Sequence, residues 1–216
     1  MNIKGLVGQL FRNDSEDAPL SLDSNGSLKV AQMGGKYAEL ARRGFLFNYT
    51  VKTAAALLLS ATTGNCPTIW NPAGSGKVLY IAKLLVNFLS GTTTVSSLQW
   101  MVTKNAGSAL GTAAPIVTFT EQDADPAIYG APFKSSMKFA PAVCTFTTAP
   151  AFLASTGIQL GAVAPSAGSG NYDQDYDGAI AIMPGNAISL CSSVTTTTSL
   201  WFSSIIGYEL PLVDGK

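Results

Sequence analysis

The segment Asn71–Val78 reads NPAGSGKV, and its Gly-Ser-Gly-Lys ending contains the residues from which phosphate-binding loops are built. That motif requires a Gly five positions before the Gly of its Gly-Lys pair, and a Ser or Thr directly after the pair. Asn71 and Val78 occupy those two positions here. A β-branched and aromatic run follows the segment, so no helix N-terminus is predicted to face a phosphate. The sequence therefore argues against nucleotide binding.

The same segment has the composition of a turn. Pro72 fixes φ near −65°, while Gly74 and Gly76 are able to adopt positive φ. Lys77 then stands at the start of a long apolar run, where we expect its charge to point toward solvent.

A second candidate is the acidic run Asp173, Asp175 and Asp177, which matches the D-x-D-x-D-G opening of an EF-hand calcium loop. Position 12 of such a loop falls on Pro184 instead of Glu, and no helix is predicted on either side, so this is not an EF-hand. Carboxylates at a spacing of two lie on one face of an extended segment. They would hold a calcium ion with ligands from elsewhere, or form a solvated edge that resists strand pairing. The pattern favours the edge, so we expect no metal and no other cofactor.

Glu121, Asp123 and Asp125 form another acidic group, directly before Pro126. Two groups of carboxylates raise the question of glycan processing, since a pair of acids is sufficient for glycoside hydrolysis. Nothing in the sequence places the two groups together, and few aromatic residues flank them as a platform for a sugar.

Composition excludes several other functions. The chain has no His, which removes the commonest general base and metal ligand. We predict no catalytic residues and no enzymatic activity. The net charge is zero, so there is no basic excess to bind nucleic acid. The longest apolar run, Val78–Leu89, is too short to span a bilayer, and the N-terminus lacks a convincing signal peptide. We therefore expect a chain made in a cytoplasm, without a membrane partner.

The three cysteines are Cys66, Cys144 and Cys191. They are odd in number, far apart and not in C-x-x-C spacing, so neither a zinc site nor a disulfide framework is indicated. We expect small buried side chains in a reducing compartment.

Residues 1–50 differ from the remainder in carrying nearly half of the charged residues, and they are predicted to form an N-terminal arm. Good helix formers, basic residues in a last turn and Gly44 just beyond predict one short helix at about 36–43. A helix this short must dock on its own core or on a neighbour. Its polar residues either bind a partner or form a solvated face. The partner-binding candidates are Tyr37, Glu39, Arg42 and Arg43, with Glu39 and Arg43 spaced as an i,i+4 ion pair.

Residues 51–216 are predicted to be an all-β domain. Short apolar or β-branched runs alternate with Gly, Pro and Asn turns, and no crossover helices separate them, which favours a β-sandwich. A jelly roll is the most specific expectation. The predicted strands include 45–51, 78–89, 97–104, 116–119, 143–147, 178–182, 187–192 and 199–210.

Four segments carry a resemblance to a known family: YAELARRGFLF (Tyr37–Phe47), IWNPAGSGKVLYI (Ile69–Ile81), IMPGNAISLCSS (Ile182–Ser193) and SSIIGYELPL (Ser203–Leu212). In this order they resemble the capsid decoration, or cement, proteins of tailed bacteriophages, which have a jelly-roll core.

The resemblance implies a structural virion protein on the capsid surface, made in the bacterial host cytoplasm. Such a protein forms a homotrimer and clamps neighbouring major capsid subunits, with its N-terminal arm reaching to neighbours. The alternative is a phage tail, collar or appendage protein with a carbohydrate-binding or glycan-processing role.

Overall fold

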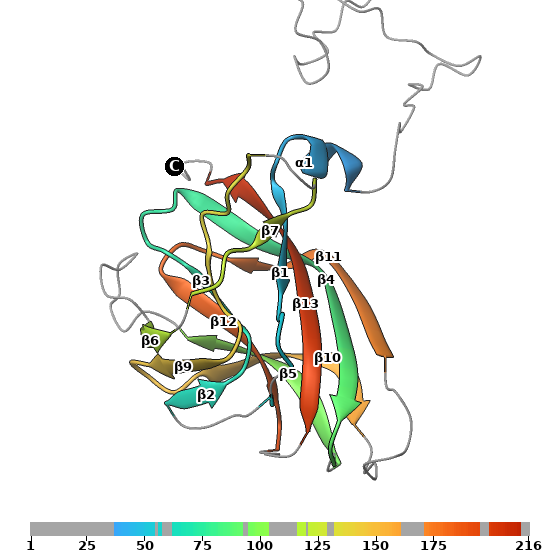
Figure 1. Ribbon diagram of the computed structural model, residues 1–216. Helices are drawn as coiled ribbons and strands as arrows, with labels where there is room; N and C mark the ends of the chain where they lie inside the picture. The colour runs from blue at the N-terminus through green and yellow to red at the C-terminus, as the bar shows by residue number, and fades with distance from the viewer. Residues whose placement is uncertain are drawn as a thin grey trace, which may run out of the picture. The chain divides into compact units, whose positions relative to one another are not determined.

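The computed structural model describes residues 37–54, 56–57, 62–92, 95–103, 116–119, 121–128, 132–160, 171–194 and 199–212. The chain divides into two compact units, 1–36 and 37–216, and all described residues belong to the second. Most of the predicted arm therefore lies outside the described residues. The second unit consists of antiparallel β-sheets with one short helix, which confirms the all-β fold (Figure 1).

The described elements follow one another in this order: α1 (Ala38–Arg42), β1 (Leu46–Thr50), β2 (Thr63–Asn65), β3 (Thr68–Asn71), β4 (Lys77–Ser90), β5 (Ser96–Thr103), β6 (Ile116–Phe119), β7 (Asp125–Pro126), β8 (Lys138–Ala140), β9 (Val143–Phe146), β10 (Ala151–Leu160), β11 (Asn171–Ile182), β12 (Asn186–Ser192) and β13 (Leu200–Pro211).

These strands form three sheets. The first has the order β11-β4-β13-β1-β7, the second β10-β5-β12-β3-β8, and a small third sheet has the order β2-β9-β6. Every pairing within them is antiparallel. Within the described part of the chain, no helix is long and apolar enough to cross a membrane.

Eight of the strands pair in a nested pattern. β1 pairs with β13, β3 with β12, β4 with β11, and β5 with β10, so the first strand of the set meets the last and the middle strands meet each other. Two further pairings, β4 with β13 and β5 with β12, join these four pairs into the two larger sheets. Successive pairs of the nested set therefore alternate between the first and the second sheet.

The main hydrophobic core draws on the facing sides of the two larger sheets. From the first sheet come Phe47, Tyr49, Leu79, Ile81, Leu84, Val86, Trp201 and Ile205, and from the second come Ile69, Leu98, Trp100, Phe139, Ile188 and Leu190. Each of these side chains is at least 97% buried. Burial of aromatic and branched side chains on both inner faces is what holds two such sheets together.

The predicted short helix is confirmed as α1, and Gly44 ends it as expected. Gly44 has φ +73°, and its N–H donates to the carbonyl of Ala41, while Phe45 N–H donates to Leu40 at 2.9 Å. This pair of bonds is a Schellman motif, which requires the left-handed conformation that Gly adopts without strain. The chain then enters β1 directly. Because β1 pairs with β13, Leu46–Thr50 belongs to the sheet, although the sequence placed it in the arm.

The long apolar run of the sequence forms β4, in the first sheet between β11 and β13. Only one face of this strand is fully buried, since Tyr80, Lys83 and Leu85 on the other face are half-buried. The register against β13 shifts by one residue at Ala82, where Ile206 faces Lys83 and Gly207 faces Ile81. Such a β-bulge sets two inward residues closer together along the strand. The bulge lets the consecutive residues Ile81 and Ala82 both be buried, which accounts for part of the continuous apolar run in a strand with one buried face.

Candidate functional site

The segment Asn71–Val78 forms a turn between β3 and β4, as predicted. Gly76 has φ +63°, whereas Gly74 does not adopt positive φ, so that part of the prediction was wrong. The Asn71 side chain holds the turn closed, because its amide donates to the carbonyls of Lys77 and Ile182, both at 2.9 Å. A strand, not a helix, follows, so the arrangement offers no helix N-terminus to a phosphate.

Lys77 does not simply point to solvent. Its side chain is 29% exposed, and its ammonium group lies 3.2 Å from a carboxylate oxygen of Glu209, which is fully buried. The sequence reading missed Glu209 as a site residue. A signal was present, since alternation along β13 places Glu209 on the same face as the buried Trp201 and Ile205.

The Glu209 carboxylate is surrounded by hydrogen-bond donors. Tyr49 donates its hydroxyl to Oε1 at 3.0 Å, and the Ser135 hydroxyl donates to the same oxygen. Ser136 N–H approaches both carboxylate oxygens, at 3.2 and 3.0 Å. This buried cluster ties β13 to β1, to β4 and to the segment before β8. Burial, reinforced by the negative charge of Glu209, raises the pKa of Tyr49 well above its usual value, so Tyr49 remains a donor.

Helix α1 and its C-cap residue Arg43 carry three of the predicted partner-binding residues, and these three bind one another. Arg42 donates to both oxygens of Glu39, at 2.9 and 2.8 Å, and Arg43 donates to one of them at 2.6 Å, which confirms the i,i+4 pair. Hydrogen bonds from Arg42, then from Arg43, lower the pKa of Glu39 to about 2. This contribution to the helix is complete above the ordinary Glu pKa and is lost as the pH falls through about 2. The guanidinium of Arg42 remains largely exposed and accessible to a partner.

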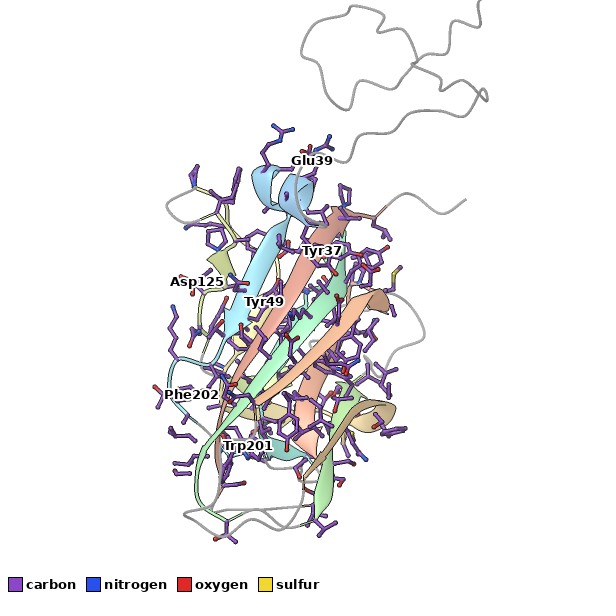
Figure 2. The ribbon with its side chains drawn as sticks, turned by 90° about the vertical axis from the view of Figure 1, so that its right-hand side faces the viewer. Tyr37, Glu39, Tyr49, Asp125, Trp201 and Phe202 are labelled. Atoms are coloured by element: carbon purple, nitrogen blue, oxygen red, sulfur yellow. The ribbon has the colours of Figure 1, made fainter. Side chains whose placement is uncertain are left out.

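Tyr37, the fourth candidate, lies against the acidic edge. Its hydroxyl is 3.3 Å from a carboxylate oxygen of Asp175 and 3.3 Å from one of Asp177. Its ring packs against Tyr208, which stacks on Tyr80 at a centroid distance of 5.1 Å. Figure 2 places Tyr37 beside the upper end of β13, below α1. The residue thus fixes the point where the preceding chain leaves the β unit.

The acidic run forms part of β11, an edge strand of the first sheet. Asp173, Asp175 and Asp177 alternate with half-buried residues and are exposed, as the spacing of two predicts. Asp173 pairs with Lys83 at 2.7 Å, and Asp175 accepts a hydrogen bond from the Asp177 N–H at 3.0 Å. Among the described residues, no three His, Cys, Asp or Glu side chains lie close enough to hold a metal ion. Of a calcium site and a solvated edge, the exposed carboxylates of this edge strand have the arrangement expected for a solvated edge.

Of the second acidic group, Asp125 lies at the other edge of the same sheet. Asp125 begins β7, which pairs with β1, while β11 pairs with β4. Four strand spacings separate β7 from β11, which amounts to roughly 19 Å across the sheet. Figure 2 shows Asp125 at the β7 edge of this sheet, whereas Tyr37, which contacts the β11 carboxylates, lies beside the central strand β13. Glu121 forms an ion pair with Lys138. The two groups do not form the closely spaced carboxylate pair of a glycosidase.

All three cysteines are buried and free, as expected, but they also come together. Cys66 and Cys191 belong to one small buried cluster with Met101, and the Cys144 sulfur lies 3.3 Å from the hydroxyl of Thr68, two residues from Cys66. Interaction with Cys144 lowers the pKa of Cys66, but interaction with Cys191 and burial outweigh it and raise this pKa well above its usual value. Interaction with Cys66, followed by burial, raises the pKa of Cys144 as well. Local sequence patterns do not indicate this cluster, because it depends on long-range strand pairing.

Strand β10 forms an edge of the second sheet and differs from β11 in having no charged residue. Phe152 is 58% exposed and Leu153 is 42% exposed, next to each other on this edge. Exposed apolar side chains on an edge strand with unpaired backbone groups are a typical site of contact with another chain. The sequence reading did not identify this strand.

No protein-family model, curated protein or solved structure matches this chain.

Proposed function

We propose that this chain is a structural virion protein that trimerises and binds the outer face of a phage capsid, where it clamps neighbouring major capsid subunits. The proposal joins the sequence resemblance to capsid decoration proteins with two features of the fold. One feature is the strand pairing, and the other is the contrast between the two long edge strands.

The nested pairing supports a jelly roll as the specific architecture. A jelly roll is a double-sheet fold of eight strands in Greek-key connection. Pairing of β1 with β13, β3 with β12, β4 with β11 and β5 with β10 is what results when one long hairpin is rolled onto itself. Folds of this kind serve many functions, so the role itself is argued from surfaces.

The contrast between the edges carries the proposal. The β11 edge presents three carboxylates to solvent, which prevents strand addition there. The β10 edge presents Phe152 and Leu153 and no charge. A protein with one protected edge and one apolar edge is suited to ring-forming contact, in which the apolar edge meets a different surface of the next copy. We therefore assign β10 to the subunit contact of the trimer.

The test is the molar mass of the purified chain by light scattering on a sizing column. We expect a trimer, at three times the chain mass of 22.4 kDa. Phe152→Asp places a charge in the apolar edge and is expected to shift the mass to that of a monomer. Leu89→Asp is the matched control, because Leu89 is 54% exposed and lies on the other sheet, so it should leave the trimer intact.

Capsid attachment is measured separately, by co-sedimentation of the protein with capsids that lack it. A wild-type monomer without affinity for capsids would contradict the proposal. The appendage role is tested by glycan binding of the same preparation. The pair of acids that this role would need has little support, since Asp125 in β7 and the carboxylates of β11 lie at opposite edges of one sheet.

A further inference from the structure

We propose that Cys66 and Cys191 are a cross-strand thiol pair placed to close a disulfide, with Cys144 as the thiol that remains free. The protein has three buried cysteines, and the proposed assembly role does not use them. Cys66 follows β2, Cys144 lies in β9 and Cys191 lies in β12, so three separate strand segments bring them together.

The register between β3 and β12, continued two residues beyond its last pair, places two of them opposite each other. Thr68 is paired with Ser189, and the Leu190 N–H donates to the Pro67 carbonyl at 3.0 Å, which continues the ladder by one pair. The next pair in this register is Cys66 with Cys191. In an antiparallel ladder it follows a hydrogen-bonded pair, so it is a non-hydrogen-bonded pair, with Cα atoms about 4.5 Å apart. Disulfides span Cα separations of about 4.4–6.8 Å.

Side-chain contacts agree with the register. The hydroxyls of Thr68 and Ser189, which point to the same side as the two thiols, are 2.8 Å apart. Cys66 and Cys191 also belong to one small buried cluster with Met101, so the two side chains pack in the same region of the interior.

Cys144 is less well placed to bond with Cys66, although its sulfur lies 3.3 Å from the hydroxyl of Thr68, two residues further along the chain. In the ladder of β2 and β9, Cys144 faces Gly64, two residues before Cys66. A diagonal pair of this kind has Cα atoms about 7–8 Å apart, beyond the usual span of a disulfide. The register thus selects Cys191 over Cys144 as the partner of Cys66.

The step needs an oxidant, and a small-molecule disulfide such as oxidised glutathione supplies it. The thiolate of one cysteine attacks the glutathione disulfide and releases one glutathione thiol. The second cysteine then attacks the mixed disulfide, releases the second glutathione and forms the protein disulfide. Two thiol protons leave, and the two electrons reduce glutathione disulfide. The pair stays reduced in a compartment rich in thiols and closes in an oxidising one.

Burial protects the thiols of the folded chain, so the experiment lets the bond form during folding. The full chain is refolded from denaturant in oxidised or reduced glutathione, and free thiols are then alkylated under denaturing conditions and counted by mass spectrometry. We expect three alkylated thiols after reducing refolding and one after oxidising refolding. Three free thiols under both conditions would overturn the proposal.

Peptide mapping identifies the bond. Trypsin alone leaves Cys144 and Cys191 on one peptide, and a second protease that cuts at Asp173–Asp177 separates them. We expect Cys66 linked to Cys191, and a Cys66–Cys144 or Cys144–Cys191 peptide would contradict the assignment. Cys144→Ala should still close the bond and leave no free thiol, whereas Cys191→Ala should keep both of its thiols.

The bond should also raise thermal stability. It would close a loop of more than a hundred residues, and constraints of that length raise the melting temperature by roughly 10 °C in a domain of this size. We expect this increase in the oxidised wild type and in Cys144→Ala, with reversal by dithiothreitol. An oxidised wild-type protein that melts no higher than the reduced one would argue against a bond compatible with the fold.

Discussion

Glu209 is the residue whose role depends most on the folded structure. A buried carboxylate is tolerated only where donors and a cation replace its water, and here Tyr49, Ser135, Ser136 and Lys77 do so. The sequence predicted that Lys77 points to solvent, because its partner Glu209 is 132 residues away along the chain and could not be recognised from the local pattern. Composition and local pattern contain no information on contacts at that separation. The alternation of β13 would have indicated a buried Glu, but not the residues that satisfy it.

Glu209→Gln is expected to lower the free energy of unfolding by about 2–4 kcal/mol, because it removes the charge that faces Lys77 and turns an amide donor toward other donors. Urea denaturation followed by circular dichroism measures the change. Glu121→Gln is the control, since Glu121 is 45% exposed and its ion pair with Lys138 should contribute no more than about 1 kcal/mol. Equal effects of the two substitutions would show that the buried cluster contributes nothing special.

Among the elements, the two long edge strands differ in how well the sequence indicates them. β11 was recognisable in part, because its carboxylates at a spacing of two mark an extended segment with one solvated face. β10 was not, because Ala151–Leu160 mixes small, polar and apolar residues, and two of its apolar residues, Phe152 and Leu153, are exposed. Its register against β5 also shifts twice, which breaks any period of two. An exposed apolar residue on an edge strand has no signal in the sequence that separates it from a buried one.

β11 contains an irregularity that yields a prediction for this element. Its register against β4 shifts between Asp175 and Ile180, and both Asp177 and Gly178 adopt positive φ there. A Cβ on Gly178 would lie 2.0 Å from the Tyr208 hydroxyl oxygen. Gly178→Ala is therefore expected to lower the free energy of unfolding by about 1–3 kcal/mol, from both strain and the clash.

Gly74→Ala is the matched substitution, because nothing lies within 4 Å of its added Cβ and its φ is not positive. It should change stability by less than about 0.5 kcal/mol. Denaturant midpoints of the two variants, measured side by side, check the prediction. A neutral Gly178→Ala would mean that the β11 irregularity rearranges freely around Tyr208.

At the scale of the whole molecule, the sequence indicated the class of the fold but not its connections. Short β-branched runs without crossover helices predict antiparallel sheets, and those sheets are present. The pairing of β1 with β13 and of β3 with β12 joins residues more than a hundred positions apart, so no local pattern predicts it. The boundary of the arm was placed late for the same reason. Leu46–Thr50 was predicted as a strand but follows a charged segment in sequence, and its pairing partner β13, which makes it part of the sheet, is near the C-terminus.

This boundary gives a prediction about the chain as a whole. The compact unit begins at Tyr37, and its core is built from residues after that point. Deletion of residues 1–35 should therefore leave the far-ultraviolet circular dichroism spectrum β-rich and the urea midpoint unchanged. Deletion of residues 1–45 is the control. It removes Tyr37 with its contacts to β11 and the Phe45 carbonyl that accepts the Glu209 N–H at 2.8 Å, so it should lower the midpoint.

The same pair of truncations separates folding from attachment. If the first 35 residues reach to neighbouring subunits, the shorter deletion should keep the oligomeric mass and lose affinity for capsids that lack the protein. The oligomeric mass should be kept because the shorter deletion leaves Tyr37 and the proposed trimer contact on β10 intact. Co-sedimentation with capsids, compared with light scattering on the same samples, measures both. An insoluble product of the shorter deletion would instead make residues 1–35 part of the core, and full affinity without them would place the capsid contact on the β unit.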